Sequence, residues 1–136
     1  MQTIEEALRE FHGRFGLHIA KRPIGFTFEE DEEYGDLFNL RMALVKEEIE
    51  EYWKAYEGED LVELADAICD LVYVLVGTAV SFGIPFDKCF AEVHRSNMSK
   101  ANPDGSVNRR EDGKILKSDQ FSPPDLRKII YEPQES

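Results

Sequence analysis

The chain has 136 residues, of which 42% are hydrophobic and 32% are charged, so its length and composition predict one domain with its own core. Its formal net charge of −12 argues against non-specific nucleic-acid binding, which depends on a basic surface. No apolar run has the length and flanks of a signal peptide or a membrane span. We therefore expect a cytoplasmic protein that binds neither nucleic acid nor membrane.

The first part of the chain is predicted to form two helices joined by a loop. Apolar side chains recur every three or four positions in residues 2–15, which indicates a helix that Gly16 ends. Residues 22–34 contain turn-forming residues and an acidic run, and they are predicted to be a loop. Helical spacing returns over residues 36–57, and the helix predicted there stops at Gly58.

A third helix is predicted over residues 61–82, with Asp60 as its N-terminal cap. From its second turn onward nearly every side chain is apolar or small, a pattern typical of a helix that is buried on all sides. One chain of 136 residues is too short to surround such a helix, so we expect a homo-oligomer, either a dimer or a tetramer. Cys69 and Cys89 lack metal or redox spacing and are expected to be buried thiols.

The remainder of the chain is predicted to contain less regular structure. Residues 86–100 show the spacing of a fourth helix, and residues 125–131 have the composition of a last short one. Between them, residues 101–124 are polar and rich in turn residues, with a short hairpin as one option. The expected fold is an all-α bundle of four to five helices completed by homo-oligomerisation. We expect one domain over 1–136, with its core at about 36–100 and a loop-rich tail over 101–136 as a cover for the site.

Acidic residues are concentrated on the second and third predicted helices. Their spacings of three, four and seven residues place the carboxylates of each helix on one face. The acids are Glu47, Glu48 and Glu51 on the second helix, and Glu63, Asp66 and Asp70 on the third. No Lys or Arg occurs between Lys54 and Lys88, so the third helix offers its acids no local cation. Because carboxylate oxygens are the ligands that Mg²⁺ and Mn²⁺ prefer, the sequence predicts a metal site between the two helices.

The acids also follow a two-part motif. The segment from Glu48 to Glu51 matches ExxE. A second part, ExxD, can be assigned in two ways: Glu63 and Asp66 match its letters, whereas Asp70 precedes the aliphatic residues that usually follow the motif. In the second assignment, Asp66 takes the place of the missing Glu. Both assignments remain open, and we carry Asp66 and Asp70 as ligands with Glu63 as a third acid.

With these acids, residues 36–126 resemble the all-α nucleoside triphosphate pyrophosphohydrolases. This superfamily includes MazG-like proteins, dimeric dUTPases and phosphoribosyl-ATP pyrophosphohydrolase. The segments 93–100, 113–117 and 123–126 are similar to its phage and bacterial MazG-like branch. The resemblance implies hydrolysis of a (deoxy)nucleoside triphosphate to the monophosphate and pyrophosphate, as in nucleotide-pool house-cleaning. It also implies Mg²⁺ as the cofactor, with Mn²⁺ as a substitute.

Site residues follow from the resemblance together with the spacing. We expect metal ligands among Glu48, Glu51, Glu63, Asp66 and Asp70, and either Glu47 or Glu48 as the base that takes a proton from water. The expected substrate-binding residues are Asn97 and Lys100 on the fourth helix, Tyr73 near Asp70, and Arg95, Lys114 and Lys117. A core tyrosine and plain surface charges are the alternatives for the last four of these.

Two other classes of protein compete with this interpretation. A non-catalytic helical dimer would keep the acids as a vestigial cation site and act as a scaffold or regulator. A carboxylate-bridged iron protein is disfavoured, because the second and third helices lack the Glu-x-x-His pattern that such bundles use. The sequence does not identify the base or sugar of the substrate.

Overall fold

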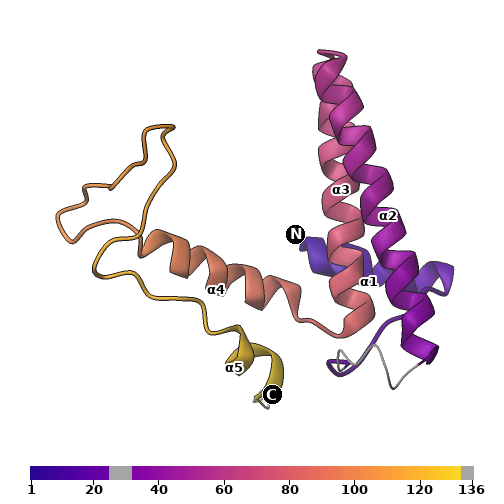
Figure 1. Ribbon diagram of the computed structural model, residues 1–136. Helices are drawn as coiled ribbons and strands as arrows, with labels where there is room; N and C mark the ends of the chain where they lie inside the picture. Colours follow the sequence, from indigo (N-terminus) through magenta and orange to yellow (C-terminus); the bar gives the residue numbers. More distant parts are fainter. Residues whose placement is uncertain (25–31, 133–136) are drawn as a thin grey trace. The chain divides into compact units, whose positions relative to one another are not determined.

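The computed structural model describes residues 1–24 and 32–132, and within them the regular structure is helical (Figure 1). The helices are α1 (Ile4–Phe15), α2 (Glu32–Glu57), α3 (Leu61–Phe82), α4 (Phe86–Met98) and α5 (Leu126–Tyr131). They belong to two compact units, Met1–Ile84 and Pro85–Ser136, which are described separately below. The prediction of an all-α fold is confirmed.

The helix boundaries agree with the sequence pattern in most places. The third helix has its predicted bounds, and α1 ends at Phe15 as expected. By contrast, α2 begins at Glu32 rather than at residue 36, so it takes in the end of the segment predicted to be a loop. The rest of that loop, 25–31, lies outside the described residues. The fourth helix ends at Met98 rather than at residue 100.

Local hydrogen bonds explain where α1 and α3 begin and end. Thr3 and Glu6 form a capping box, in which each side chain accepts a hydrogen bond from the other residue's backbone N–H. The carboxylate of Asp60 accepts hydrogen bonds from the first backbone N–H groups of α3. Gly16 and Gly83 end the two helices in the left-handed conformation, with φ of 68° and 74°, which glycine adopts without strain.

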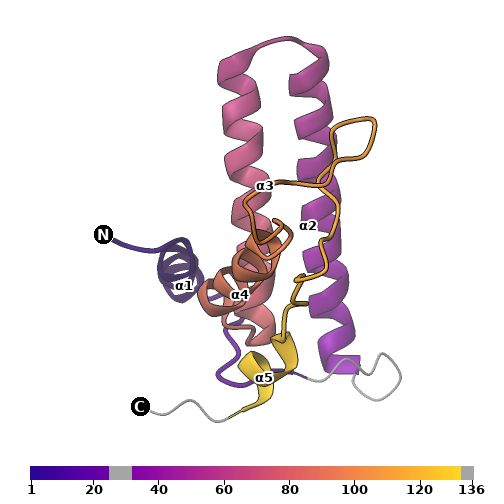
Figure 2. The same ribbon diagram turned by 90° about the vertical axis from the view of Figure 1, so that its left-hand side faces the viewer.

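The first unit is built on a long antiparallel pair, α2 and α3, with α1 packed against α3 (Figures 1 and 2). Its core lies at the C-terminal half of α3, where Val76 and Val80 are almost fully buried together with Leu8 of α1. The segment after α1 runs along the same end of α3, because Ala20 and Ile24 donate backbone hydrogen bonds to its last carbonyl groups. This end of the pair is therefore well covered.

The N-terminal half of α3 is much less covered. Leu61 and Val62 are 78% and 80% exposed, and Ile68 and Leu75 are about half exposed. A single chain thus leaves part of α3 exposed to solvent. We expected α3 to be buried on all sides only in an oligomer. The same sequence gives α3 the length and apolar composition of a membrane span, which core helices of soluble proteins also have.

The exposure of α3 corrects one expectation about the cysteines. Cys89 on α4 is buried, as predicted, but Cys69 on α3 is exposed. The reason is that Cys69 lies in the part of α3 that a single chain leaves uncovered. Cys69 is a free thiol.

In the second unit, α4 and α5 are joined by a long loop that folds back on the end of α4. Within this loop, Arg109 and Ile115 form an isolated antiparallel bridge, which gives the predicted hairpin its single rung. The Ser118 hydroxyl donates to the carbonyl groups of Ser99 and Ala101, at 3.2 and 3.0 Å. Side-chain hydrogen bonds therefore close the base of the loop on the carbonyl groups of the turn that follows α4.

Candidate functional site

Glu48 of α2 lies within electrostatic reach of four other predicted acids, two on its own helix and two on α3. Glu48 is half-buried, and burial raises the pKa of its carboxyl group. The pKa of Glu48 is raised further by the charges of Asp70, Glu51, Glu47 and Asp66, in that order. Like charges raise a carboxyl pKa mainly at short range, so acids of both α2 and α3 lie near Glu48. Glu48 is the centre of the group.

Glu63 differs from the other acids. It is exposed in the first turn of α3, where its backbone N–H donates a hydrogen bond to Asp60, and it is not among the charges that act on Glu48. A carboxylate in that turn also interacts favourably with the helix dipole. The structure therefore places Glu63 at the periphery of the acidic group, which we define as Glu47, Glu48, Glu51, Asp66 and Asp70.

Little positive charge compensates this group within the described part of the chain. Glu51 lies 3.6 Å from the ammonium of Lys54, and both side chains are more than half exposed, so this pair contributes little. No ion pair to Glu48, Asp66 or Asp70 occurs among residues 1–24 and 32–132. The local field is thus strongly negative and favours a bound cation.

The chemistry of these donors fits a hard divalent cation. All of them are carboxylates, and they approach one another from two helices, which is how Mg²⁺ and Mn²⁺ are commonly held. Within the described residues, however, no three acidic, histidine or cysteine side chains are gathered closely enough to ligate one ion. Carboxylates of like charge repel, and glutamates have several rotatable bonds. The two helix backbones therefore bring the acidic faces near each other, but the described side chains do not form a complete set of metal ligands.

Two aromatic residues near the acids make packing contacts. The Tyr73 ring packs edge-on against Phe11 of α1, with ring centroids 5.3 Å apart, so it contributes to the α1–α3 contact. Trp53 on α2 is 60% exposed and lies beside Tyr56, with centroids 6.0 Å apart. The packing alternative is thus favoured for Tyr73, while Trp53 keeps an exposed face.

The predicted substrate-binding residues outside α2 and α3 all belong to the second unit. Asn97 is exposed in the last turn of α4, and the backbone N–H of Lys100 donates to its carbonyl oxygen at 3.1 Å. Because α4 ends at Met98, Lys100 lies in the turn after the helix, which corrects its expected place on it. The early end is explained by Ser99, whose hydroxyl bonds the Ser96 carbonyl and caps the helix.

The three remaining basic residues have local roles. Arg95 pairs with Glu92 at 2.6 Å and also donates to the Ser122 hydroxyl and the Pro123 carbonyl oxygen. Arg95 therefore attaches the chain before α5 to α4. The ammonium of Lys117 lies 4.8 Å from the ring centroid of Phe121, a cation–π contact. Lys114 follows the hairpin turn, and its backbone N–H donates to Asp112.

Sequence analysis missed one charged residue of the first unit, Arg41. Its side chain is only 6% exposed, and it donates hydrogen bonds to Val74 and Thr78 of α3. A signal was available, since Arg41, Glu48 and Ala55 recur every seven residues on α2, and Arg41 and Ala55 are buried there. A basic residue on a buried stripe marks a polar contact inside the helix pair.

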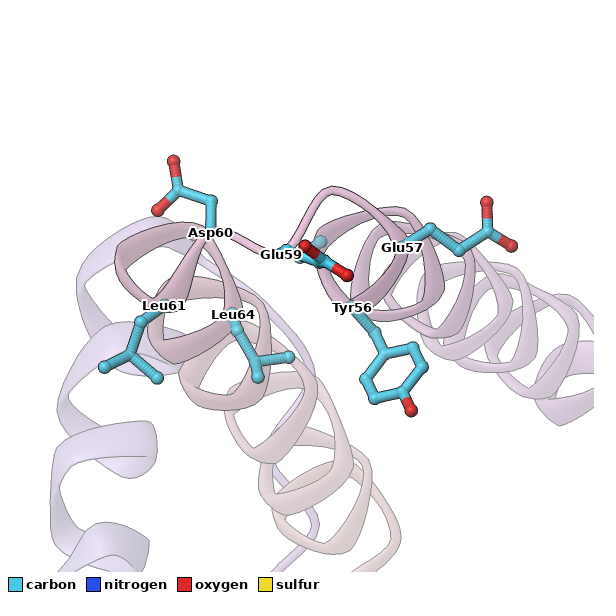
Figure 3. A pocket seen from close by; sticks show the side chains of 7 residues that line it. Tyr56, Glu57, Glu59, Asp60, Leu61 and Leu64 are labelled. Carbon is cyan, nitrogen blue, oxygen red and sulfur yellow. The ribbon is translucent and has the colours of Figure 1, made fainter.

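A pocket of about 400 Å³ lies at the turn between α2 and α3, away from the centre of the acidic group. Its lining residues are Ala55, Tyr56, Glu57, Glu59, Asp60, Leu61 and Leu64. Figure 3 shows Tyr56, Leu61 and Leu64 on one side of the turn, with the carboxylates of Glu57 and Asp60 directed to the other. The pocket thus has an apolar side that continues the exposed surface of α3.

Comparison with known proteins assigns the chain to a family. The family model of phosphoribosyl-ATP pyrophosphohydrolase matches residues 8–97, which include α2, α3 and all six acids. Uncharacterized protein L479 of Acanthamoeba polyphaga mimivirus is 33% identical over 87 residues, or 62% of this chain and 33% of that protein. The chain thus spans about a third of the length of this relative. From the family match over most of its length, the chain belongs to the phosphoribosyl-ATP pyrophosphohydrolase family, within the all-α, MazG-like nucleoside triphosphate pyrophosphohydrolase superfamily.

Proposed function

We propose that this protein hydrolyses a (deoxy)nucleoside triphosphate to the monophosphate and pyrophosphate, with Mg²⁺ as its cofactor. The observation that carries the proposal is the group of carboxylates around Glu48, which α2 and α3 both contribute and which has little paired positive charge among the described residues. Water screens part of the repulsion, because Glu48 is half-buried and the other four acids are exposed, and a bound cation would offset the remainder. A triphosphate that carries Mg²⁺ supplies such a cation together with the phosphates.

In this proposal Glu48, Glu51, Asp66 and Asp70 hold Mg²⁺, with Glu63 at the edge of the site. The metal supplies charge neutralisation at the phosphate oxygens and an acidified water. The chain's own part in the reaction is to orient the substrate and to accept a proton. The carboxylate of Glu47 or Glu48 takes that proton as water attacks the α-phosphorus, and pyrophosphate departs. Water adds one oxygen and one proton to the nucleotide, and the second proton stays on the carboxylate until it is released.

The cations of the second unit are proposed to act on the substrate. The Asn97 amide carries no charge and the Lys100 ammonium has no acceptor, so neither can replace a carboxylate as a metal ligand. Lys100 suits a phosphate oxygen as a point charge, and Asn97 suits a phosphate or sugar oxygen. Lys114 and Lys117 are secondary candidates for the phosphates. Arg95 is occupied with Glu92 and the chain before α5, which favours a structural role for it.

A second candidate substrate comes from the matched family. Phosphoribosyl-ATP is a nucleoside triphosphate with an added ribosyl phosphate on its base, and its hydrolysis releases pyrophosphate in the same way. The acidic group treats both substrates alike, since its carboxylates would act on the triphosphate rather than on the base. The two candidates must therefore be separated by assay.

The test is a panel of canonical and damaged nucleoside and deoxynucleoside triphosphates, with phosphoribosyl-ATP included. Each is incubated with the protein and Mg²⁺, and the nucleotide products are separated by chromatography while pyrophosphate is measured by a coupled assay. We expect monophosphate and pyrophosphate in equal amounts, and ¹⁸O from labelled water in the monophosphate. A diphosphate and inorganic phosphate would contradict the proposed bond cleavage. Cation binding without turnover of any substrate would favour the scaffold or regulator.

We also propose that the protein is a homodimer or homotetramer. Support comes from the exposed apolar side chains on the uncovered surface of α2 and α3, among them Trp53, Tyr56, Leu61 and Val62. Removing such a surface from water stabilises an assembly by roughly 25 cal/mol per Å². Light scattering at low micromolar concentration should give a dimeric or larger mass, and a monomeric mass would contradict the proposal. Val62→Asp should shift the protein toward monomer, whereas Lys54→Asp is the matched exposed control.

A further inference from the structure

One cation is buried within the α2–α3 pair, two helical turns from the centre of the acidic group. Arg41 lies seven residues before Glu48, and its side chain is 6% exposed. Its Nη2 donates to the carbonyl oxygen of Val74 at 2.7 Å, and its Nε donates to Oγ1 of Thr78 at 3.1 Å. The Thr78 hydroxyl in turn donates to the same Val74 carbonyl at 2.8 Å. Arg41 therefore binds two successive turns of α3 at once.

These contacts determine which parts of α2 and α3 lie at one level. In an antiparallel pair, moving seven residues forward on α2 corresponds to moving about seven residues back on α3, because each residue rises 1.5 Å. Since Arg41 lies level with Val74 and Thr78, Glu48 lies level with residues 67–71. That range contains Asp70, the strongest charged neighbour of Glu48. The Arg41 contacts thus set α2 and α3 at the same relative level at which Glu48 lies near Asp70.

The surroundings of Arg41 hold its side chain in one place. A Cβ on Gly77 would lie 2.5 Å from Nη2 of Arg41 and 2.9 Å from Nε2 of His12, so glycine is needed for this close approach. The oxygen acceptors of Arg41 are neutral, and no carboxylate pairs with it in the described residues. An apolar side chain of similar length would fill the space without removing a charge from water. Unlike an apolar side chain, the planar guanidinium makes hydrogen bonds in fixed directions, because its donors are arranged in a rigid fork.

We propose that Arg41 is a positioning residue, which fixes the rotation and separation of α2 against α3 and so holds Glu48 opposite Asp66 and Asp70. The short turn at Gly58 and Asp60 fixes the other end of the pair. The acidic group lies between these two fixed points, where neither the turn nor the α1 contact alone determines how the helices face each other. The link to metal binding rests on the proposed function, but the helix positions are measurable without it.

The first test uses variants that alter the fork without adding bulk. Arg41→Lys keeps the charge but has no planar fork with which to bind Thr78 and Val74 together. Thr78→Val removes one acceptor in a side chain of the same shape, and Thr78→Ser keeps the hydroxyl. Mn²⁺ affinity without nucleotide is measured by titration calorimetry on the whole protein. We expect Arg41→Lys and Thr78→Val to weaken Mn²⁺ binding by about tenfold, the lower end of the usual effect of changing a residue that supports metal ligands without touching the metal. Thr78→Ser should bind like the parent.

A matched control separates positioning from general stability. Leu8 on α1 is 1% exposed, so Leu8→Ala lowers stability without touching the Arg41 contacts. All variants are compared at a temperature where circular dichroism shows each of them folded. Leu8→Ala should keep the parent's Mn²⁺ affinity despite its lower melting temperature. If Arg41→Lys and Thr78→Val also keep it, their role is structural only and the proposal is overturned.

The second test measures the helix positions directly and in the absence of metal. Nitroxide labels are placed on the exposed Cys69 of α3 and on a cysteine that replaces the exposed Glu50 of α2, with Cys89→Ser throughout. Labelled protein is diluted with unlabelled protein, so that electron–electron dipolar spectroscopy reports distances within one chain. Arg41→Lys and Thr78→Val should shift or broaden the distance distribution, and Leu8→Ala should not. An unchanged distribution overturns the proposal whatever the metal affinity. A parent that binds no Mn²⁺ contradicts only the proposed function.

Discussion

His12 Nδ1 donates a hydrogen bond of 3.0 Å to the carbonyl oxygen of His18, which ties the end of α1 to the segment that follows it. A carbonyl oxygen only accepts, so the proton of the neutral ring is on Nδ1 and Nε2 is bare. Burial lowers the pKa of His12, the bond to His18 raises it, and the charges of Arg41 and His18 lower it, with a net decrease. His12 is therefore held neutral beside the buried guanidinium of Arg41.

This histidine makes stability depend on pH. Below about pH 6.5 an unfolded His12 takes up a proton that the folded chain does not, so the free energy of unfolding should fall as the pH decreases. The slope due to one proton is at most about 1.4 kcal/mol per pH unit. Urea unfolding at pH values from about 7.5 down to 5 measures it, across the range in which histidine titrates. His12→Gln should flatten the curve, while His94→Gln, an exposed control, should keep it. Equal curves for the parent and His12→Gln would contradict the assignment.

Gly77→Ala should lower the free energy of unfolding by about 1–3 kcal/mol, the usual effect of overpacking a filled core. The added Cβ would lie 2.5 Å from Arg41 and 2.9 Å from His12, and hydrogen bonds hold both side chains in place. Gly13 is a matched control on α1, because a Cβ there has no atom within 4 Å. Gly13→Ala should instead raise stability by about 0.5–1 kcal/mol, the helix preference of alanine over glycine. Denaturant unfolding measures both, and a stability gain for Gly77→Ala would show that the contact is loose.

Asp70→Asn should reduce pyrophosphate release by about a hundredfold or more, since the site loses a charged oxygen ligand next to Glu48. Without metal, the same change removes a repulsive charge, so the melting temperature should stay equal or rise. Glu51→Gln should behave similarly and Glu63→Gln more mildly. Glu50→Gln, which changes an exposed acid of α2 outside the group, should keep the parent's rate. Full activity in folded Asp70→Asn would remove Asp70 from the site.

Lys100→Ala should weaken triphosphate binding or slow turnover while leaving Mn²⁺ affinity without nucleotide nearly unchanged. Lysine has no acceptor for a metal but suits a phosphate oxygen, so the loss should appear only when a triphosphate is present. Calorimetric titration with Mn²⁺, and then with a non-hydrolysable triphosphate, separates the two effects. Lys128→Ala, an exposed lysine of α5 in the same unit, is the control. If Lys100→Ala binds and turns over the nucleotide like the parent, the phosphate-binding cation must be Lys114 or Lys117.

Much of the secondary structure could be predicted because its causes are local. Asp60 and Gly83 supply the hydrogen bonds and the left-handed end that bound α3, so its limits could be read from the residues themselves. The grouping of the acidic residues could be predicted equally well, since the spacing of Glu48 and Glu51 places them on one face of any helix. The end of α4 at Met98 was missed, because it depends on the side chain of Ser99, which also bonds the returning segment at Ser122.

The sequence by itself therefore determined which residues are helical and which acids share a helix face, because a 3.6-residue period needs no partner to be recognised. Only the tertiary structure decided which of these faces meet. It places Glu48 beside Asp70 and leaves Glu63 at the edge, since the opposing levels of two antiparallel helices depend on how they pack. It also buries Arg41, a residue that its charge alone would assign to the surface, because the hydroxyl of Thr78 and the carbonyl of Val74 replace the water that the guanidinium loses.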